Sequence, residues 1–278
     1  MTTIVSPAPG GAAQRARWFV SDSLALAGRN LQHVRQIPEK LLDVTLQPIM
    51  FVLLFAFVFG NVIAVPGGDY REYLIGGILV QSLAFGMMGP GMSIASDLGE
   101  GMVDRIRSLP TSRSAYLMGH FMAELGATLL AVLILAVTGL AIGWSIDGGV
   151  PDALAGFALL LASAAAMIWI GTLLGVTARS PDAVQGLVFM IVFPLTFLSN
   201  AFVPAAGLPS GLREIAEWNP VSAVVAAVRT LFGNPTAIPA DAAWPLQHPV
   251  TAAVLWTGLF LAVAVPLTIR RFRARTAG

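Results

Sequence analysis

The sequence has no cysteine among its 278 residues and a single lysine, Lys40. The absence of cysteine excludes disulfide bonds, thiolate nucleophiles and cysteine metal sites. The three histidines, His33, His120 and His248, are far apart, and no G-x-x-x-x-G-K-S/T phosphate-binding sequence surrounds Lys40. We therefore expect no catalytic residues, no metal site and no cofactor bound by this chain.

Charge is also scarce, at 11% of residues, whereas 56% are apolar. A helix that crosses the hydrocarbon core of a membrane needs about 20 apolar residues. The sequence therefore predicts an all-α, polytopic membrane protein rather than a water-soluble domain. Six runs of suitable length form a predicted transmembrane domain over residues 43–269: 43–63, 73–95, 114–143, 153–176, 183–203 and 250–269.

Two shorter segments lie before this domain and one lies after it. Residues 1–12 are small and polar, which favours a disordered N-terminus. Residues 13–37 repeat apolar side chains every three or four positions among arginines, so we expect an amphipathic helix lying flat on the cytoplasmic membrane surface. A helix packed on a soluble partner is the alternative. Residues 270–278 form a basic tail.

The basic residues predict the orientation of the spans. With the N-terminus in the cytoplasm, all of the 16 Lys and Arg residues except Arg71, Arg213 and Arg229 lie on the cytoplasmic side. Cytoplasmic loops of membrane proteins carry an excess of Lys and Arg. Both termini are therefore expected to face the cytoplasm.

Residues 96–113 form a charged island between two long apolar runs. Gly99 and Gly101 interrupt helix and Pro110 would end it, so Met102–Leu109 is predicted to form about two helical turns. Such a short helix, with a narrow apolar edge and charged flanks, suits docking into a groove on another protein. The alternative is a solvated turn whose arginines only fix the topology.

Residues 204–249, between the last two spans, are predicted to form an external helical hairpin. Residues 208–218 read as a short amphipathic helix. Residues 220–231 are largely apolar but too short to span, which fits a re-entrant helix that dips back toward the membrane.

Glu124 is the one acidic residue well inside a predicted span, and His120 lies one turn before it on the same helix face. Ionisable groups inside membranes are costly and usually face a bundle interior, water or a partner, so a functional role is one hypothesis. The alternative is a pair that satisfies itself at the i, i+4 spacing.

Two stretches carry a resemblance to a known family: EGMVDRIRSLPTSRSAYLMGH, residues 100–120, and FPLTFLSNAFVPAAGLPSGLREIAEWNPVSAVVAAVR, residues 193–229. In their six-span frame they resemble the permease subunit of type-2 ABC exporters, in particular the daunorubicin-resistance type, over about residues 13–273. The residues of the second stretch that match the family's pattern are Pro194, Phe197, Ser199, Phe202, Pro204, Leu208, Pro209, Asn219 and Pro220.

The resemblance implies a bacterial plasma-membrane permease that works with a separate cytoplasmic ATPase, which would bind ATP and Mg, and with a second permease subunit, identical or different. The implied helix that couples to the ATPase comprises Glu100, Gly101, Met102, Asp104, Arg105, Ile106, Arg107, Leu109 and Pro110. Apolar spans rich in Phe and Met favour a hydrophobic or amphiphilic cargo, a drug or lipid. The alternatives are export of polysaccharide or lipid-linked glycan, a secondary transporter, and a membrane scaffold that does not transport.

Overall fold

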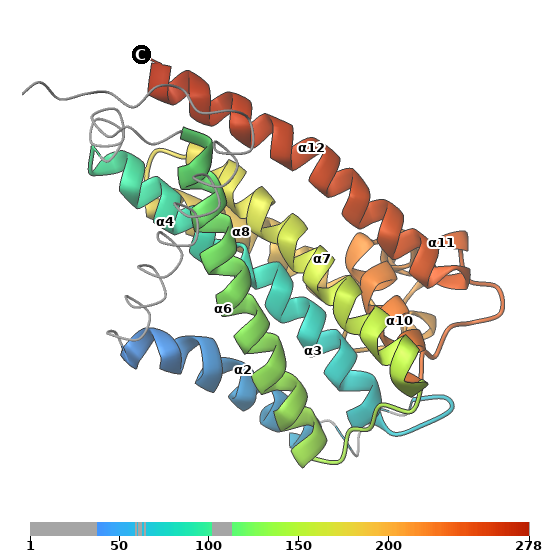
Figure 1. Cartoon of the computed structure of the whole chain (residues 1–278). Coiled ribbons are helices and arrows are strands. Elements are labelled where there is room, and N and C mark those ends of the chain that lie inside the picture. Colours follow the sequence, from blue (N-terminus) through green and yellow to red (C-terminus); the bar gives the residue numbers. More distant parts are fainter. Residues whose placement is uncertain (1–37, 59, 61–62, 64, 102–112, 278) are drawn as a thin grey trace, which may run out of the picture.

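The computed structural model describes residues 38–58, 60, 63, 65–101 and 113–277. The predicted segments 1–12 and 13–37 therefore lie outside the described residues. The longer helices are α2 (Pro38–Val58), α3 (Tyr70–Gly86), α4 (Met88–Gly99), α6 (Arg113–Ala141), α7 (Gly149–Thr177), α8 (Pro181–Phe197) and α12 (Pro249–Ala277) (Figure 1). Between α8 and α12 lie η1 (Ala205–Gly207), α9 (Ser210–Trp218), α10 (Pro220–Phe232) and α11 (Trp244–Gln247).

The prediction of an all-α, polytopic membrane protein is confirmed in its general form. Four helical stretches are long and apolar enough to cross a membrane: Tyr70–Gly99, Tyr116–Ala141, Gly149–Thr177 and Pro249–Arg275. Helices α2 and α8 occupy the two other predicted ranges, but their apolar parts, Ile49–Val58 and Pro181–Phe197, are shorter. No β-strand occurs in the described ranges.

Helices α3 and α4 are two parts of one rod that changes direction at Met87. Pro90 has no backbone N–H and cannot donate to the carbonyl of Gly86, so the regular helix is interrupted there. The bend lies against α7, where a Cβ on Gly171 would come within 2.0 Å of the Met87 carbonyl oxygen. Only glycine permits so close an approach, which fixes the contact between the bend and α7.

Glycines also provide the close contact between α4 and α7. A Cβ on Gly91 would lie 2.7 Å from the Gly171 carbonyl, and one on Gly175 would lie 2.2 Å from the Gly91 carbonyl. A Cβ on Gly89 would lie 3.7 Å from Glu124 Oε2, an ordinary contact, whereas a Cβ on Gly86 would have nothing within 4 Å. The contact of α4 with α7 therefore depends on Gly91, Gly171 and Gly175.

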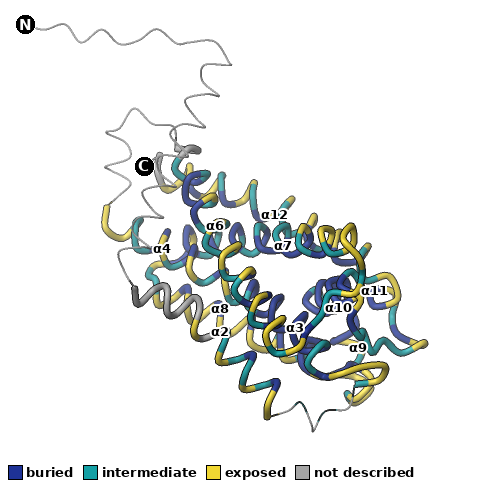
Figure 2. The backbone as a smooth tube through the Cα atoms, turned by 60° about the horizontal axis from the view of Figure 1, so that its bottom comes forward, coloured by how far each residue is buried: buried dark blue, intermediate teal, exposed yellow. Residues whose placement is uncertain are grey.

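Helix α10 is the most deeply buried short element, and it packs against α3, α7 and α12. Residues 221–229 are all buried, and Figure 2 shows α10 mainly in dark blue. By contrast, α8 buries only a stripe at Val184, Val188, Val192 and Thr196. Its other large side chains are exposed, with Met190 at 70%.

The fifth predicted span ends earlier than expected. Its helix, α8, stops at Phe197 rather than continuing to Val203. Ser199 donates to the Thr196 carbonyl at 2.6 Å and accepts from the Ala201 N–H at 3.1 Å, so side-chain hydrogen bonds replace the next helical turn. The apolar composition of this segment did not predict that side-chain hydrogen bonds would end the helix at this point.

Candidate functional site

The predicted coupling loop begins where α4 ends. The helix stops at Gly99, as expected, and Ser96 Oγ donates to Glu100 Oε1 at 2.8 Å. Gly101 has φ +73°, a left-handed conformation that suits glycine and turns the chain away from the helix. The remaining residues of the predicted coupling helix lie outside the described residues: Met102, Asp104, Arg105, Ile106, Arg107, Leu109 and Pro110.

Three helices meet at the base of this loop. The Tyr116 hydroxyl on α6 donates to Asp97 on α4, and the Tyr116 ring stacks on Phe272 of α12 at 5.8 Å between centroids. Arg275 also donates to the Ala178 carbonyl at the end of α7, at 3.1 Å. The loop therefore emerges from a junction in which α4, α6 and α12 are in direct contact.

The predicted intramembrane residues His120 and Glu124 lie at the interface of α6 with α4. His120 is buried and donates to the backbone carbonyl of Pro90, whereas its Nε2 atom has no hydrogen-bond partner among the described residues. The Glu124 carboxylate lies beside Gly89. Both side chains therefore lie at the contact between α6 and α4, in keeping with the tendency of ionisable groups in spans to face the bundle interior. The two do not satisfy each other through Nε2.

Asn219 joins α8 to the predicted hairpin. Its Nδ2 donates to the carbonyls of Leu195 and Leu198, at 2.7 and 2.8 Å, and its Oδ1 accepts from the Val221 N–H at 2.8 Å. One amide thus caps the C-terminus of α8 and the N-terminus of α10, two ends that would otherwise leave buried polar groups unpaired. Pro220 follows at the first position of α10, where a missing N–H costs nothing.

The other residues of the hairpin motif lie around the same junction. Phe202 stacks on Phe55 of α2 at 4.9 Å and contacts Phe197 at 5.5 Å. Ser199 forms the turn after α8, and Pro204 is buried at the start of η1. The structure therefore brings the motif residues together, except for Pro194, whose side chain is exposed on α8.

Sequence reasoning did not identify Arg229, the largest fully buried side chain. Its guanidinium donates to the carbonyls of Tyr73, Asn200 and Ala201, at 2.8, 2.9 and 2.9 Å. It also lies 3.3 Å from the centroid of the Tyr73 ring, a cation–π contact. A Cβ on Gly76 would approach Arg229 Cγ at 3.0 Å, so α3 is shaped around this side chain.

We call Tyr70, Tyr73, Asn200, Ala201 and Arg229 the Arg229 cluster. The Tyr73 hydroxyl donates to the Asn200 carbonyl at 2.6 Å, which therefore accepts from two side chains. The Tyr70 hydroxyl and Asn200 Oδ1 are buried and have no hydrogen-bond partner among the described residues. The cluster binds α10 to α3 and to the turn after α8. An arginine within an otherwise apolar segment was the one signal that could have revealed it.

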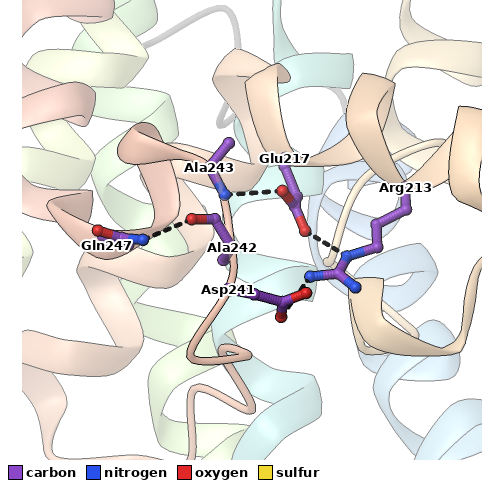
Figure 3. A network of polar contacts seen from close by, with 6 residues as sticks. All are labelled: Arg213, Glu217, Asp241, Ala242, Ala243 and Gln247. Atoms are coloured by element: carbon purple, nitrogen blue, oxygen red, sulfur yellow. Dashed lines mark hydrogen bonds and ion pairs between the residues drawn. The ribbon is translucent and has the colours of Figure 1, made fainter.

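An ionic network holds the more exposed side of the hairpin (Figure 3). Arg213 of α9 contacts Glu217 at 2.6 Å and Asp241 at 2.7 Å, and Glu217 accepts from the Ala243 N–H at 2.7 Å. The hydrogen bond from Arg213 lowers the pKa of the exposed Asp241 carboxyl. Gln247 donates to the Ala242 carbonyl at 2.6 Å, so α9, the following loop and α11 are joined.

These helices and the polar junctions between them define a multi-pass helical membrane protein. The end of α4, where the charged loop begins, and the hairpin before α12 lie at opposite ends of the bundle (Figure 1). Residues 22–232 match the ABC-2 type transporter family, and the chain belongs to this family. It is therefore a membrane permease of an ABC transporter, as the resemblance predicted.

Two proteins that are similar to this chain over nearly its full length are named as drug-resistance permeases. The chain is 29% identical over 258 residues to the daunorubicin resistance ABC transporter permease protein DrrB1 of Streptomyces coeruleorubidus, which covers 93% of this chain and 88% of the relative. It is 24% identical over 269 residues to the probable doxorubicin resistance ABC transporter permease protein DrrC of Mycobacterium tuberculosis, covering 96% and 94%. A putative transport permease, ycf38 of Porphyra purpurea, is 23% identical over 220 residues, covering 78% and 75%.

Proposed function

We propose that this chain is the membrane-spanning subunit of an ATP-driven exporter that moves a hydrophobic or amphiphilic cargo, a drug or lipid, out of the cell. A separate cytoplasmic ATPase binds ATP and Mg and supplies the energy. The observation that carries the proposal is the family match over residues 22–232, together with the near full-length similarity to permeases named for daunorubicin and doxorubicin resistance.

The charged loop, residues 96–113, is the proposed contact with the ATPase. Its position supports this role because its base touches three helices at once, through Asp97, Tyr116 and Phe272. A displacement of the loop would therefore act on α4, α6 and α12 together. The proposal places the loop, both termini and the basic tail 270–278 in the cytoplasm, on the basic side of a bacterial plasma membrane.

A second permease, identical or different, is proposed to complete the pathway. Helix α8 supports this because most of its surface is exposed and apolar, including Met190 at 70%, Phe193 at 50% and Phe197 at 46%. An exposed apolar face suits both lipid and the same kind of face on a partner. In this arrangement α2, α3–α4, α6, α7, α8 and α12 are the six spans, and α9–α11 form the external hairpin.

The orientation is tested by labelling single cysteines, which is direct because the chain has none of its own. Cysteines introduced at the exposed positions Val150 and Ala240 should react in intact cells with a thiol reagent that cannot cross the membrane. A cysteine at Ser108 should react only after the membrane is opened. Reaction at Ser108 in sealed cells would contradict the proposed orientation.

Two substitutions in the loop test the function itself. Ile106→Asp places a carboxylate on the apolar edge, and Arg105→Glu reverses a flanking charge. An unpaired charge at a contact costs several kcal/mol, which corresponds to a loss of affinity of about a hundredfold or more. The measurements are copurification of the ATPase and cargo-stimulated ATP hydrolysis in membranes.

The matched control is Arg71→Glu, the same charge reversal at the opposite end of the bundle, which should leave both measurements unchanged. All three variants should insert normally, because none of the substituted residues lies within an apolar stretch of the spans. If both loop variants kept the ATPase and full transport, the loop would be a solvated turn. The scaffold alternative would then be preferred.

A further inference from the structure

A cavity of about 210 Å³ lies inside the bundle, between α3, α7, α8, α10 and α12. Its lining side chains are apolar or aromatic except for Ser163 and Thr257, whose hydroxyls lie 3.2 Å apart and satisfy each other. For comparison, an engineered apolar cavity of roughly 150 Å³ stays dry and takes up benzene. Protein interiors are close-packed, so a cavity of this size is a distinct feature of the fold.

The chemistry of the lining excludes polar ligands and ordered water. A buried water needs two to four polar partners, and the one polar pair in this lining is already engaged. A charged or strongly hydrogen-bonding ligand would lose its hydration without replacement. The cavity can therefore bind only apolar matter.

The shape of the cavity favours a chain over a compact ring. Its lining on α7 extends from Ser163 to Leu174, which corresponds to about 16 Å along a helix that rises 1.5 Å per residue. On α8 it extends from Val188 to Leu195, the central and final turns of that helix. The cavity therefore runs along the bundle axis, parallel to lipid chains in the surrounding membrane.

The cavity reaches the surface of the bundle at α8. Ile191 lines it and is 48% exposed, whereas Val188 and Val192 on the same helix are fully buried. The neighbouring surface of α8 is apolar and exposed, as expected for a face at the depth of the hydrocarbon core. An acyl chain could enter from the membrane at this point without crossing any polar surface.

We propose that this cavity is a binding site for one acyl chain of a membrane phospholipid, inserted from the α8 side. The bound chain fills the space between α8 and α12 and contacts Val221 and Val224 of α10. It therefore stabilises the position of α10 in the hairpin. The lipid is a resident component of the permease and not its cargo. The proposal therefore does not depend on the proposed function.

Trp256 provides the readout because it lines the cavity. The purified chain is reconstituted without an ATPase into bilayers of unbrominated phospholipid or of phospholipid with brominated acyl chains, which quench nearby indoles. The contribution of Trp256 to quenching is the difference between the unsubstituted protein and Trp256→Phe. Ala84→Leu then fills the cavity from α3, while Ala158→Leu makes the same change at an exposed position on α7.

The expected result is that Ala84→Leu lowers the quenching of Trp256 about twofold or more, because a filled cavity leaves no room for the chain, and that Ala158→Leu leaves it unchanged. Equal quenching of Trp256 in the unsubstituted protein, Ala84→Leu and Ala158→Leu would show that only bulk lipid reaches the indole, and the proposal would be wrong. If Ala84→Leu does not fold, Val224→Phe fills the same space from α10 and is subject to the same criterion.

Discussion

Replacing Arg229 with methionine tests whether a buried cation holds α10 in place. The substitution removes three hydrogen bonds from a charged donor, each contributing about 1.5–3 kcal/mol. It also removes the contact with the Tyr73 ring, about 1–2 kcal/mol. In the opposite direction, the protein no longer has to desolvate a guanidinium, which returns several kcal/mol. The net loss of stability should be about 2–4 kcal/mol, because the Ala201 carbonyl is left buried without this donor.

The assay is the apparent midpoint of thermal unfolding of the purified protein in detergent. A loss of 1 kcal/mol lowers the midpoint of a domain of this size by roughly 2–4 °C, so Arg229→Met should lower it by about 5–15 °C. Arg229→Lys separates charge from geometry. An ammonium group keeps the charge but cannot reach three carbonyls in the plane of a guanidinium. We expect the lysine variant to lie close to the methionine variant.

Arg271→Met is the control, since Arg271 is exposed near the end of α12, and it should shift the midpoint by no more than about 2 °C. A lysine variant as stable as the unsubstituted protein would show that charge alone matters. A methionine variant with an unchanged midpoint would show that desolvation cancels the hydrogen bonds. Either result would refute the reasoning given above.

Three further predictions concern the same end of the bundle. Gly77→Ala should prevent normal folding or lower the midpoint by more than about 10 °C, because its Cβ would lie 2.0 Å from a backbone oxygen, whereas Gly86→Ala, with nothing within 4 Å, should not. Asn219→Asp keeps the acceptor that caps α10 but loses the two amide hydrogen bonds to α8, so its unfolding midpoint should lie close to that of Asn219→Ala. The lowered pKa of Asp241 means that its bond to Arg213 stabilises the protein above the unfolded pKa of about 4 and is lost as the pH falls further. The difference in midpoint between Asp241→Asn and the unsubstituted protein should therefore shrink as the pH falls below about 4, and it should disappear only below the lowered pKa of Asp241.

The apolar runs predicted the four helical stretches that are long and apolar enough to cross a membrane. The predicted range 73–95 lies within α3–α4, and 153–176 lies within α7. In a membrane an apolar segment forms a helix because a helix satisfies all its backbone hydrogen bonds within the segment. The beginning of α10 at Pro220 was also predictable from its short apolar run. The end of α8 was not, since it depends on side-chain hydrogen bonds from Ser199 and Asn219 that leave no trace in hydropathy.

The Arg229 cluster escaped prediction for a different reason. In the count of basic residues, Arg229 is simply one of three that are not predicted to lie on the cytoplasmic side. Its partners are backbone carbonyls, which every residue possesses, and one of them belongs to Tyr73, 156 positions away in the sequence. Complementary charges can be sought in a sequence, whereas an arginine whose hydrogen bonds all go to backbone carbonyls has no charged partner to find there. Its site is visible only when α3, α10 and the turn after α8 are seen together.

The helical rod α3–α4 connects the two specialised ends of the molecule. Its first turns accept Arg229 and enclose the turn at Ala201, and its last residues lead into the charged loop. Between them, the bend at Met87 rests on Gly171, with no space for even a methyl group. Because packed interfaces respond to force by moving between discrete arrangements rather than by deforming continuously, a displacement at the loop end must move α7 with the rod or change the bend. The glycines of α4 and α7 therefore fix the rod to α7 between the Arg229 cluster and the start of the charged loop.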